Sequence, residues 1–91
     1  MRVRYLPRAF AEREAIFEYL DQHSSQGARN VKQAIVHAIR LLADFPMLGP
    51  ETQERGAYEL SIPRYPYKVY YRVEEAEVWI VHIRHTRREP L

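Results

Sequence analysis

The stretch that decides the fold is AYELSIPRYPYKVYYRVEEAEVWIVHIRH, residues 57–85. Polar and apolar residues alternate through three runs of it, which is the period of strands that bury one face. The apolar faces of the first two runs are Tyr58, Leu60 and Ile62, and then Tyr67, Val69, Tyr71 and Val73. Strict alternation in the third run places together Trp79, Val81, Ile83 and His85, opposite Val78, Ile80, His82 and Arg84. Turn residues separate the runs, so an antiparallel meander is predicted.

The chain before this stretch has the period of helices. PRAFAEREAIFEYLDQH, residues 7–23, carries an apolar stripe of Ala9, Phe10, Ile16, Phe17 and Leu20. Arg13 falls inside that stripe, so its stem must pack while its charged end reaches solvent. After SSQG, residues 24–27, a second stripe comprises Ala28, Val31, Ile35, Ala38, Ile39, Leu42 and Phe45, and Pro46 ends it.

Together these patterns predict an α+β fold in two layers. RVRYL, residues 2–6, alternates and predicts an N-terminal strand, whose place at the edge or the centre of the sheet stays open. An antiparallel helical hairpin follows, and the apolar face of the three-stranded antiparallel meander covers it. We expect a single domain over residues 1–91, because a chain of this length builds one core.

Composition narrows the class of protein. The chain has no cysteine, which excludes disulfides and thiolate metal sites and suits a reducing cytoplasm. No apolar run approaches the ~20 residues of a membrane span, and the first residues have no signal-peptide pattern, so we expect a cytoplasmic protein without membrane contact. The net charge is only +2, but Arg84, Arg87 and Arg88 gather near the C-terminus. This cluster suits an acidic partner, either nucleic acid or an acidic peptide, and equally suits a solvated cationic tail that aids solubility.

The polar face of the meander is the candidate site. It collects Glu59, Ser61, Lys68, Tyr70, Arg72, His82 and Arg84, with Arg64 in the turn PRYP. Cations hold phosphates and tyrosine rings stack on unpaired bases, so the face suits nucleic acid; an antiparallel sheet also commonly leaves one face polar without a function. His82 and His85 are three apart and point to opposite faces, so no metal site or cofactor is predicted.

RYPYKVYYRV, residues 64–73, followed by a strand that ends in HTRREP, residues 85–90, resembles the RelE/ParE superfamily of toxins from type II toxin–antitoxin modules. The resemblance covers essentially the whole chain. It implies a growth-arresting toxin held inactive by a cognate antitoxin, in complexes that are commonly of higher order. ParE-like members, among them plasmid stabilisation proteins, poison DNA gyrase. RelE-like members cleave messenger RNA on the ribosome with basic residues on the open sheet face and often a tyrosine near the C-terminus.

Residue by residue, the resemblance favours the ParE-like branch and a toxin that is not an enzyme. Lys68 matches a basic active-site residue of the ribonucleases, but Glu59 and Ser61 stand where their lysines lie, and no tyrosine follows HTRREPL. The surface expected to bind target or antitoxin comprises Arg64, Lys68, Tyr70, Arg72, Arg84, Arg87 and Arg88. The alternatives are a non-toxic antitoxin-binding remnant, or a metal-independent, ribosome-dependent endoribonuclease with catalytic residues among Lys68, His82, Arg84 and His85.

Overall fold

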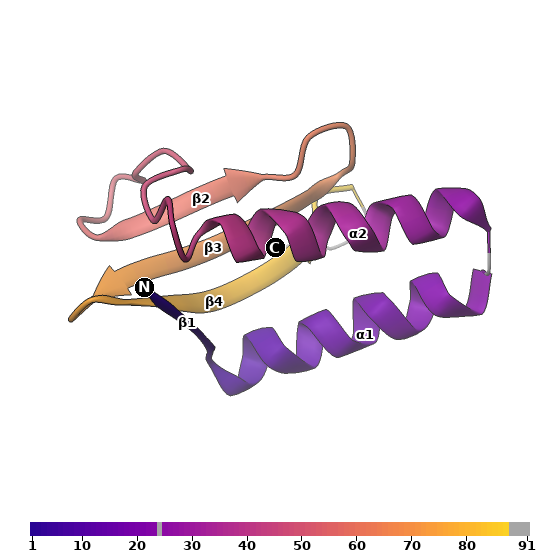
Figure 1. Ribbon diagram of the computed structural model, residues 1–91, viewed down its shortest axis with the longest axis horizontal. Helices are drawn as coiled ribbons and strands as arrows, with labels where there is room; N and C mark the ends of the chain where they lie inside the picture. The colour runs from indigo at the N-terminus through magenta and orange to yellow at the C-terminus, as the bar shows by residue number, and fades with distance from the viewer. Residues whose placement is uncertain (24, 88–91) are drawn as a thin grey trace.

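The computed structural model describes residues 1–23 and 25–87, in which two antiparallel helices lie against one face of a four-stranded sheet (Figure 1). The elements in chain order are β1 (Arg2–Tyr5), α1 (Pro7–His23), α2 (Gln26–Leu41), β2 (Ala57–Ser61), β3 (Tyr67–Glu74) and β4 (Glu77–His85). The predicted α+β architecture, with its N-terminal strand, helical hairpin and meander, is confirmed.

The sheet has the strand order β1-β4-β3-β2, so β1 lies at an edge. It runs parallel to β4 and pairs Arg2–Tyr5 with Glu77–Ile80, whereas the other neighbouring strands are antiparallel. Because β1 ends at Tyr5, no strand of the described chain lies beside the second half of β4 on that side. The first residues of α1 pass this uncovered edge, which becomes important for the site.

The pairing of β3 with β4 contains a β-bulge. Tyr70 lies opposite His82 while Tyr71 lies opposite Ile80, so Val81 is an extra residue on β4. An extra residue interrupts the alternation of side chains between the two faces of the sheet, so the residues before it and the residues after it do not follow one continuous alternation. The two halves of β4 therefore follow opposite phases of the alternation.

The bulge corrects the strict alternation predicted for the last strand. Val78, Ile80 and Ile83 are all fully buried in the core, although the sequence pattern placed Ile83 on the other face from the first two. Trp79 pairs with Arg4 and joins the open side of the sheet. The prediction that Trp79 and Ile83 share a face was wrong, because the alternation is interrupted between them.

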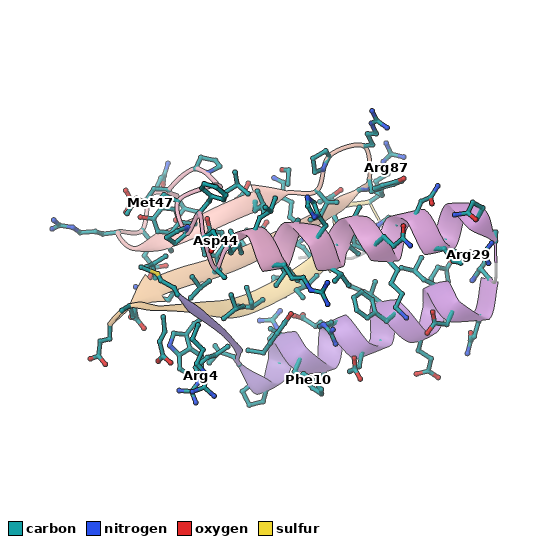
Figure 2. The ribbon with its side chains drawn as sticks, viewed as in Figure 1. Arg4, Phe10, Arg29, Asp44, Met47 and Arg87 are labelled. Atoms are coloured by element: carbon teal, nitrogen blue, oxygen red, sulfur yellow. The ribbon has the colours of Figure 1, made fainter. Side chains whose placement is uncertain are left out.

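The core lies between the helices and the sheet, and most of the predicted apolar residues reach it. Its buried members include Ala9, Phe17, Ile35, Ile39, Leu42, Tyr58, Leu60, Ile62, Tyr67, Val69 and Tyr71. Two predicted core residues do not: Phe10 is 50% exposed on the outer side of α1 (Figure 2), and Phe45 is 58% exposed. Phe45 lies beyond the end of α2 at Leu41, where the helical period no longer applies.

Arg13 behaves as its position in the stripe required. Its guanidinium carbon lies 4.6 Å from the centre of the Phe17 ring and 5.6 Å from that of Tyr5. Its charged end also pairs with Glu14 at 2.9 Å. The stem thus covers apolar surface while the charge stays satisfied at the rim.

The segment between α2 and β2 is held against the sheet. The backbone N–H of Gly49 donates to the buried hydroxyl of Tyr71 at 3.0 Å. The backbone N–H of Glu59 donates to the carbonyl of Pro50 at 3.1 Å, and that of Thr52 donates to the carbonyl of Ala57 at 2.8 Å. These bonds cover part of the outer edge of β2, which limits pairing with another chain there.

Candidate functional site on the open face

The candidate site is the sheet face that points away from the helices, here called the open face. Strand register assigns to it Arg4, Glu59, Ser61, Lys68, Tyr70, Arg72, Trp79, His82 and Arg84. All seven residues that the sequence placed on the polar face are present. Trp79 and Arg4 were not foreseen, Trp79 because its side depends on the bulge.

Lys68, the basic residue of the middle strand, is paired with a carboxylate. Its Nζ lies 2.8 Å from Oε1 of Glu59 on β2. The hydrogen bond to Glu59, followed by the attraction between the two charges, raises the pKa of Lys68. Each side chain is about one third exposed, at 34% and 33%. The Lys68 ammonium group therefore already has an anionic partner.

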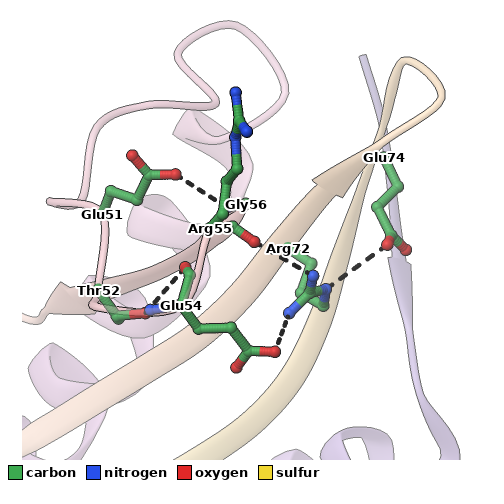
Figure 3. Close-up of polar contacts among 7 residues, drawn as sticks. All are labelled: Glu51, Thr52, Glu54, Arg55, Gly56, Arg72 and Glu74. Atoms are coloured by element: carbon green, nitrogen blue, oxygen red, sulfur yellow. Dashed lines mark hydrogen bonds and ion pairs between the residues drawn. The ribbon is translucent and has the colours of Figure 1, made fainter.

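Arg72, at the other end of β3, is also matched by carboxylates (Figure 3). Its guanidinium lies 3.0 Å from Glu54 and 3.5 Å from Glu74, and it donates to the backbone carbonyl of Arg55 at 3.4 Å. Glu51 accepts the backbone N–H of Gly56 at 2.8 Å and so fixes the turn before β2. The turn thereby presents a carboxylate and a carbonyl to the same guanidinium.

The third charged group on the face is Arg4. It lies 3.4 Å from Glu77 and its guanidinium carbon lies 5.2 Å from the centre of the Trp79 ring. In the pairing of β4 with β3, Trp79 lies opposite Arg72. The result is a row of arginine, tryptophan and arginine across three strands, with a carboxylate near each arginine.

His82 sits between this row and Lys68 and is held by a residue from α1. Oε2 of Glu12 lies 2.7 Å from Nδ1 of His82, and Oε1 accepts the backbone N–H of Ile83 at 2.9 Å. Glu12 thus covers the β4 edge that β1 leaves free. The ring of Tyr70 stacks on the imidazole with centres 5.5 Å apart and planes 18° apart.

Arg84 differs from the other cations of the open face. It lies opposite Lys68 in the pairing of β3 with β4. Among residues 1–23 and 25–87 it forms no ion pair, and its buried Nε has no hydrogen-bond partner. The other three cations of the open face, Arg4, Lys68 and Arg72, each have a carboxylate partner. Arg84 has none in the described chain and is therefore the group most available to an incoming acceptor.

The remaining predicted residues lie apart from this cluster. His85 is opposite Tyr67, meets its ring edge-on at 4.9 Å, and accepts the backbone N–H of Arg87 at Nδ1. It therefore points to the opposite face from His82, as expected. Arg64 has a positive φ of 73° in the exposed turn between β2 and β3. Arg87 is exposed beyond β4 (Figure 2), and Arg88 lies outside the described residues.

A second feature is an apolar groove between α2 and β2. It is lined by Ala34, Ala38, Leu41, Leu48, Leu60 and Tyr65. Asn30, His37 and Arg64 stand at its polar margin. Sequence periodicity placed the helix and the strand in contact layers but could not show that their packing leaves this groove.

Two further observations concern the described part of the chain. No group of three or more His, Asp or Glu side chains there is arranged to hold a metal ion. None of its helices has the length and apolar character needed to cross a membrane.

Comparisons with solved structures match this fold over nearly the whole chain. The toxin–antitoxin system "Chromosomal ParDE TA system from P. aeruginosa" contains a chain that matches with a TM-score of 0.75 at 23% identity, over 96% of this chain and 97% of that one. A chain of the intact E. coli RelBE toxin–antitoxin complex matches with a TM-score of 0.69 at 12% identity, over 96% and 98%. The isolated E. coli RelE toxin gives 0.70 at 12% identity, over 97% and 86%.

Sequence comparison identifies the family. Among curated proteins, no sequence matches this chain. The model of the family described as "ParE toxin of type II toxin-antitoxin system, parDE" matches residues 3–90. That match spans every strand and helix of the fold except the first residue of β1, so the chain belongs to the ParE toxin family of type II toxin–antitoxin systems.

Proposed function

We propose that this ParE-family chain arrests bacterial growth by acting on DNA gyrase and is neutralised by a cognate antitoxin. Membership of the family supports the toxin role. The solved relatives that share the fold come from ParDE and RelBE toxin–antitoxin systems, which supports an antitoxin as partner. The choice of gyrase depends on the chemistry of the open face.

The observation that carries this choice is the pair between Glu59 and Lys68 at 2.8 Å. A nuclease without a metal needs cations that are free to stabilise the charge developing on the scissile phosphate. Here a phosphate would have to displace a carboxylate from Lys68 and would meet the negative charge of Glu59. A face that alternates both signs of charge fits a protein surface better than a polyanion.

The groove between α2 and β2 supports an antitoxin of complementary character. Among the residues that line the groove, Arg64 is cationic and none is acidic. An amphipathic segment with apolar residues toward Leu41 and Leu60 and an acidic residue toward Arg64 would bury the groove and match that charge. The antitoxin's sequence tests this proposal, because it must contain a segment with that acidic and apolar pattern.

A second candidate function, message cleavage on the ribosome, is favoured by one observation. His82, Tyr70 and Arg84 share the open face, where a titratable ring, an aromatic ring and an unpaired cation are the groups that a ribonuclease uses. Lys68 would complete such a site only after leaving Glu59. We therefore place this function second.

Expression from a tightly controlled promoter without the antitoxin tests the proposal. SOS reporter activity and total messenger RNA are followed together, and supercoiling by purified gyrase is assayed with the purified protein. We expect an early SOS response, intact messages and loss of supercoiling. Rapid message cleavage without SOS would establish the ribonuclease instead, and no effect on growth would identify a non-toxic antitoxin-binding remnant.

A pair of matched variants locates the working surface. Arg84→Gln removes the open-face cation that has no ion-pair partner in the described chain. Arg55→Gln removes the same charge from an exposed turn residue whose contact with Arg72 uses only its backbone carbonyl. We expect the first variant to lose growth arrest and the second to retain it. Equal activity of both variants would move the working surface away from the open face.

A further inference from the structure

The contact between Glu12 and His82 fixes where the histidine carries its proton. An ionised carboxylate only accepts hydrogen bonds, so a ring nitrogen 2.7 Å from Oε2 must donate one. Oε1 is already engaged with the backbone N–H of Ile83. The geometry therefore assigns a proton to Nδ1 of His82.

The other ring nitrogen of His82 is open to solvent. No described residue forms a hydrogen bond with Nε2. A buried nitrogen without a partner would stand out as unsatisfied, and in the described chain the one such side-chain atom is Nε of Arg84. Nε2 of His82 is therefore not buried. In the neutral ring with its proton on Nδ1, Nε2 carries a free lone pair. The stacked ring of Tyr70 holds the imidazole plane, so the direction of that lone pair is fixed.

An unpaired donor lies next to this acceptor. Arg84 is two residues further along β4 on the same face, and its guanidinium has no partner among the described residues. Alternate residues of a strand are about 7 Å apart, which is roughly the span of one amide group with a hydrogen bond at each end. An amide offers a carbonyl oxygen to Arg84 and an N–H to His82.

We propose that His82 and Arg84 together recognise an amide group of the toxin's protein target, either a backbone peptide or an Asn or Gln side chain. Glu12 is the positioning residue, because it makes His82 an acceptor. The inference rests on the proposed function in that the partner of the open face is a protein. It adds the chemistry of the contact and a residue of α1 on which that chemistry depends.

Glu12→Gln tests the proposal, because it keeps a side chain of the same length beside His82, although it also removes the exposed ion pair of Oε2 with Arg8 at 3.2 Å. The new carboxamide oxygen still accepts the N–H of Ile83, but its NH₂ group now donates to Nδ1 of His82. The proton must then move to Nε2, which converts the acceptor on the open face into a donor. Glu14→Gln is the matched control, since it removes the same charge from the same helix and faces Arg13 instead.

The first readout is the nitrogen NMR spectrum of the histidine rings, assigned by comparison with His82→Phe. We expect the proton on Nδ1 in the wild type and in Glu14→Gln, and on Nε2 in Glu12→Gln. A wild-type ring with its proton on Nε2, or protonated on both nitrogens at neutral pH, would overturn the proposal. This measurement needs no target and so does not depend on gyrase.

The second readout is toxin potency, measured as the induction level needed for growth arrest and as the concentration that half-inhibits supercoiling. Glu12→Gln should require about tenfold more protein or beyond, because a donor then faces a donor. His82→Phe, which keeps the ring beside Tyr70, should show a similar loss, and Glu14→Gln should match the wild type. Thermal unfolding of each variant confirms that the fold is retained.

The outcomes separate the two proposals. If the wild type arrests growth but leaves gyrase unaffected, the proposed target is wrong, while the effect of Glu12→Gln on growth arrest still decides the recognition pair. If the proton moves as expected and potency does not change, the recognition pair is wrong and the gyrase proposal stands. A wild type that arrests nothing would remove both.

Discussion

Gly49→Ala should destabilise the protein strongly, because the space for one methyl group is already filled by backbone. A Cβ atom at this position would lie 2.7 Å from the carbonyl oxygen of Glu59, 2.9 Å from its carbonyl carbon and 3.1 Å from the Cα of Leu60. Ordinary contacts begin near 3.4 Å. None of the three atoms belongs to a side chain that could rotate away, so the loop or β2 must shift.

The magnitude follows from what the shift disturbs. Overpacking of a tight site costs roughly 1–3 kcal/mol. The same movement stretches the hydrogen bond from Gly49 to Tyr71 at 3.0 Å and that from Glu59 to Pro50 at 3.1 Å, which adds about 1 kcal/mol. We therefore expect a loss of about 2–4 kcal/mol in the free energy of unfolding. For a domain of this size, that lowers the melting temperature by about 10 °C or more.

Gly27→Ala provides the matched control with the opposite sign. This glycine lies in the first turn of α2, and its nearest neighbour for a new Cβ is the Ser25 hydroxyl at 3.8 Å, an ordinary contact. Alanine is the better helix former, so the control should gain about 0.5 kcal/mol. Urea unfolding followed by circular dichroism measures both. A Gly49→Ala protein within about 0.5 kcal/mol of the wild type would refute the steric argument, which rests on the estimate for overpacking.

Three further predictions concern stability. Tyr71→Phe leaves the N–H of Gly49 without its acceptor and should cost about 1–3 kcal/mol in urea unfolding. Ser25→Ala removes the N-cap of α2, whose hydroxyl accepts the N–H of Ala28 at 3.0 Å, and should cost about 1 kcal/mol with a loss of helical signal on mild heating. Burial raises the pKa of Tyr71 above 10.0, so above that pH the unfolded chain releases the proton first and stability should fall. The raised pKa of Lys68 acts in the same direction, because its contribution is complete below 10.5 and is lost as the pH rises through the folded value. An unfolding free energy that stays flat as the pH rises above 10.0 and then above 10.5 would contradict both assignments.

The helices and strands were predictable because each follows its own period over enough residues. The exceptions have local causes that periodicity does not contain. Val81 adds one residue to β4, and nothing in VWIVHIRH marks which residue is extra. Phe10 satisfies the helical stripe but belongs to the first turns of α1, where the buried position is Ala9. A stripe predicts which side of a helix is apolar, not how far along that side the neighbouring layer extends.

The candidate site was also predictable from the sequence only in part. The residues of the open face could be predicted because alternate positions of a strand share a side. Their partners could not, because these come from other elements: Glu12 reaches His82 across 70 positions of the chain. Glu59 and Lys68 are an intermediate case, since both were placed on the polar face but their ion pair depends on the register of β2 with β3.

The charge balance of the open face therefore depends on the whole fold rather than on its composition. Lys68 and Arg4 each meet one carboxylate, Arg72 meets two, and the N-terminal part of α1 supplies a fifth carboxylate to His82. At the end of this arrangement, the buried Nε of Arg84 has no hydrogen-bond partner among residues 1–23 and 25–87. A surface that neutralises its own cations loses long-range attraction for a polyanion but keeps directional hydrogen bonds, which is the property that recognition of one protein surface requires.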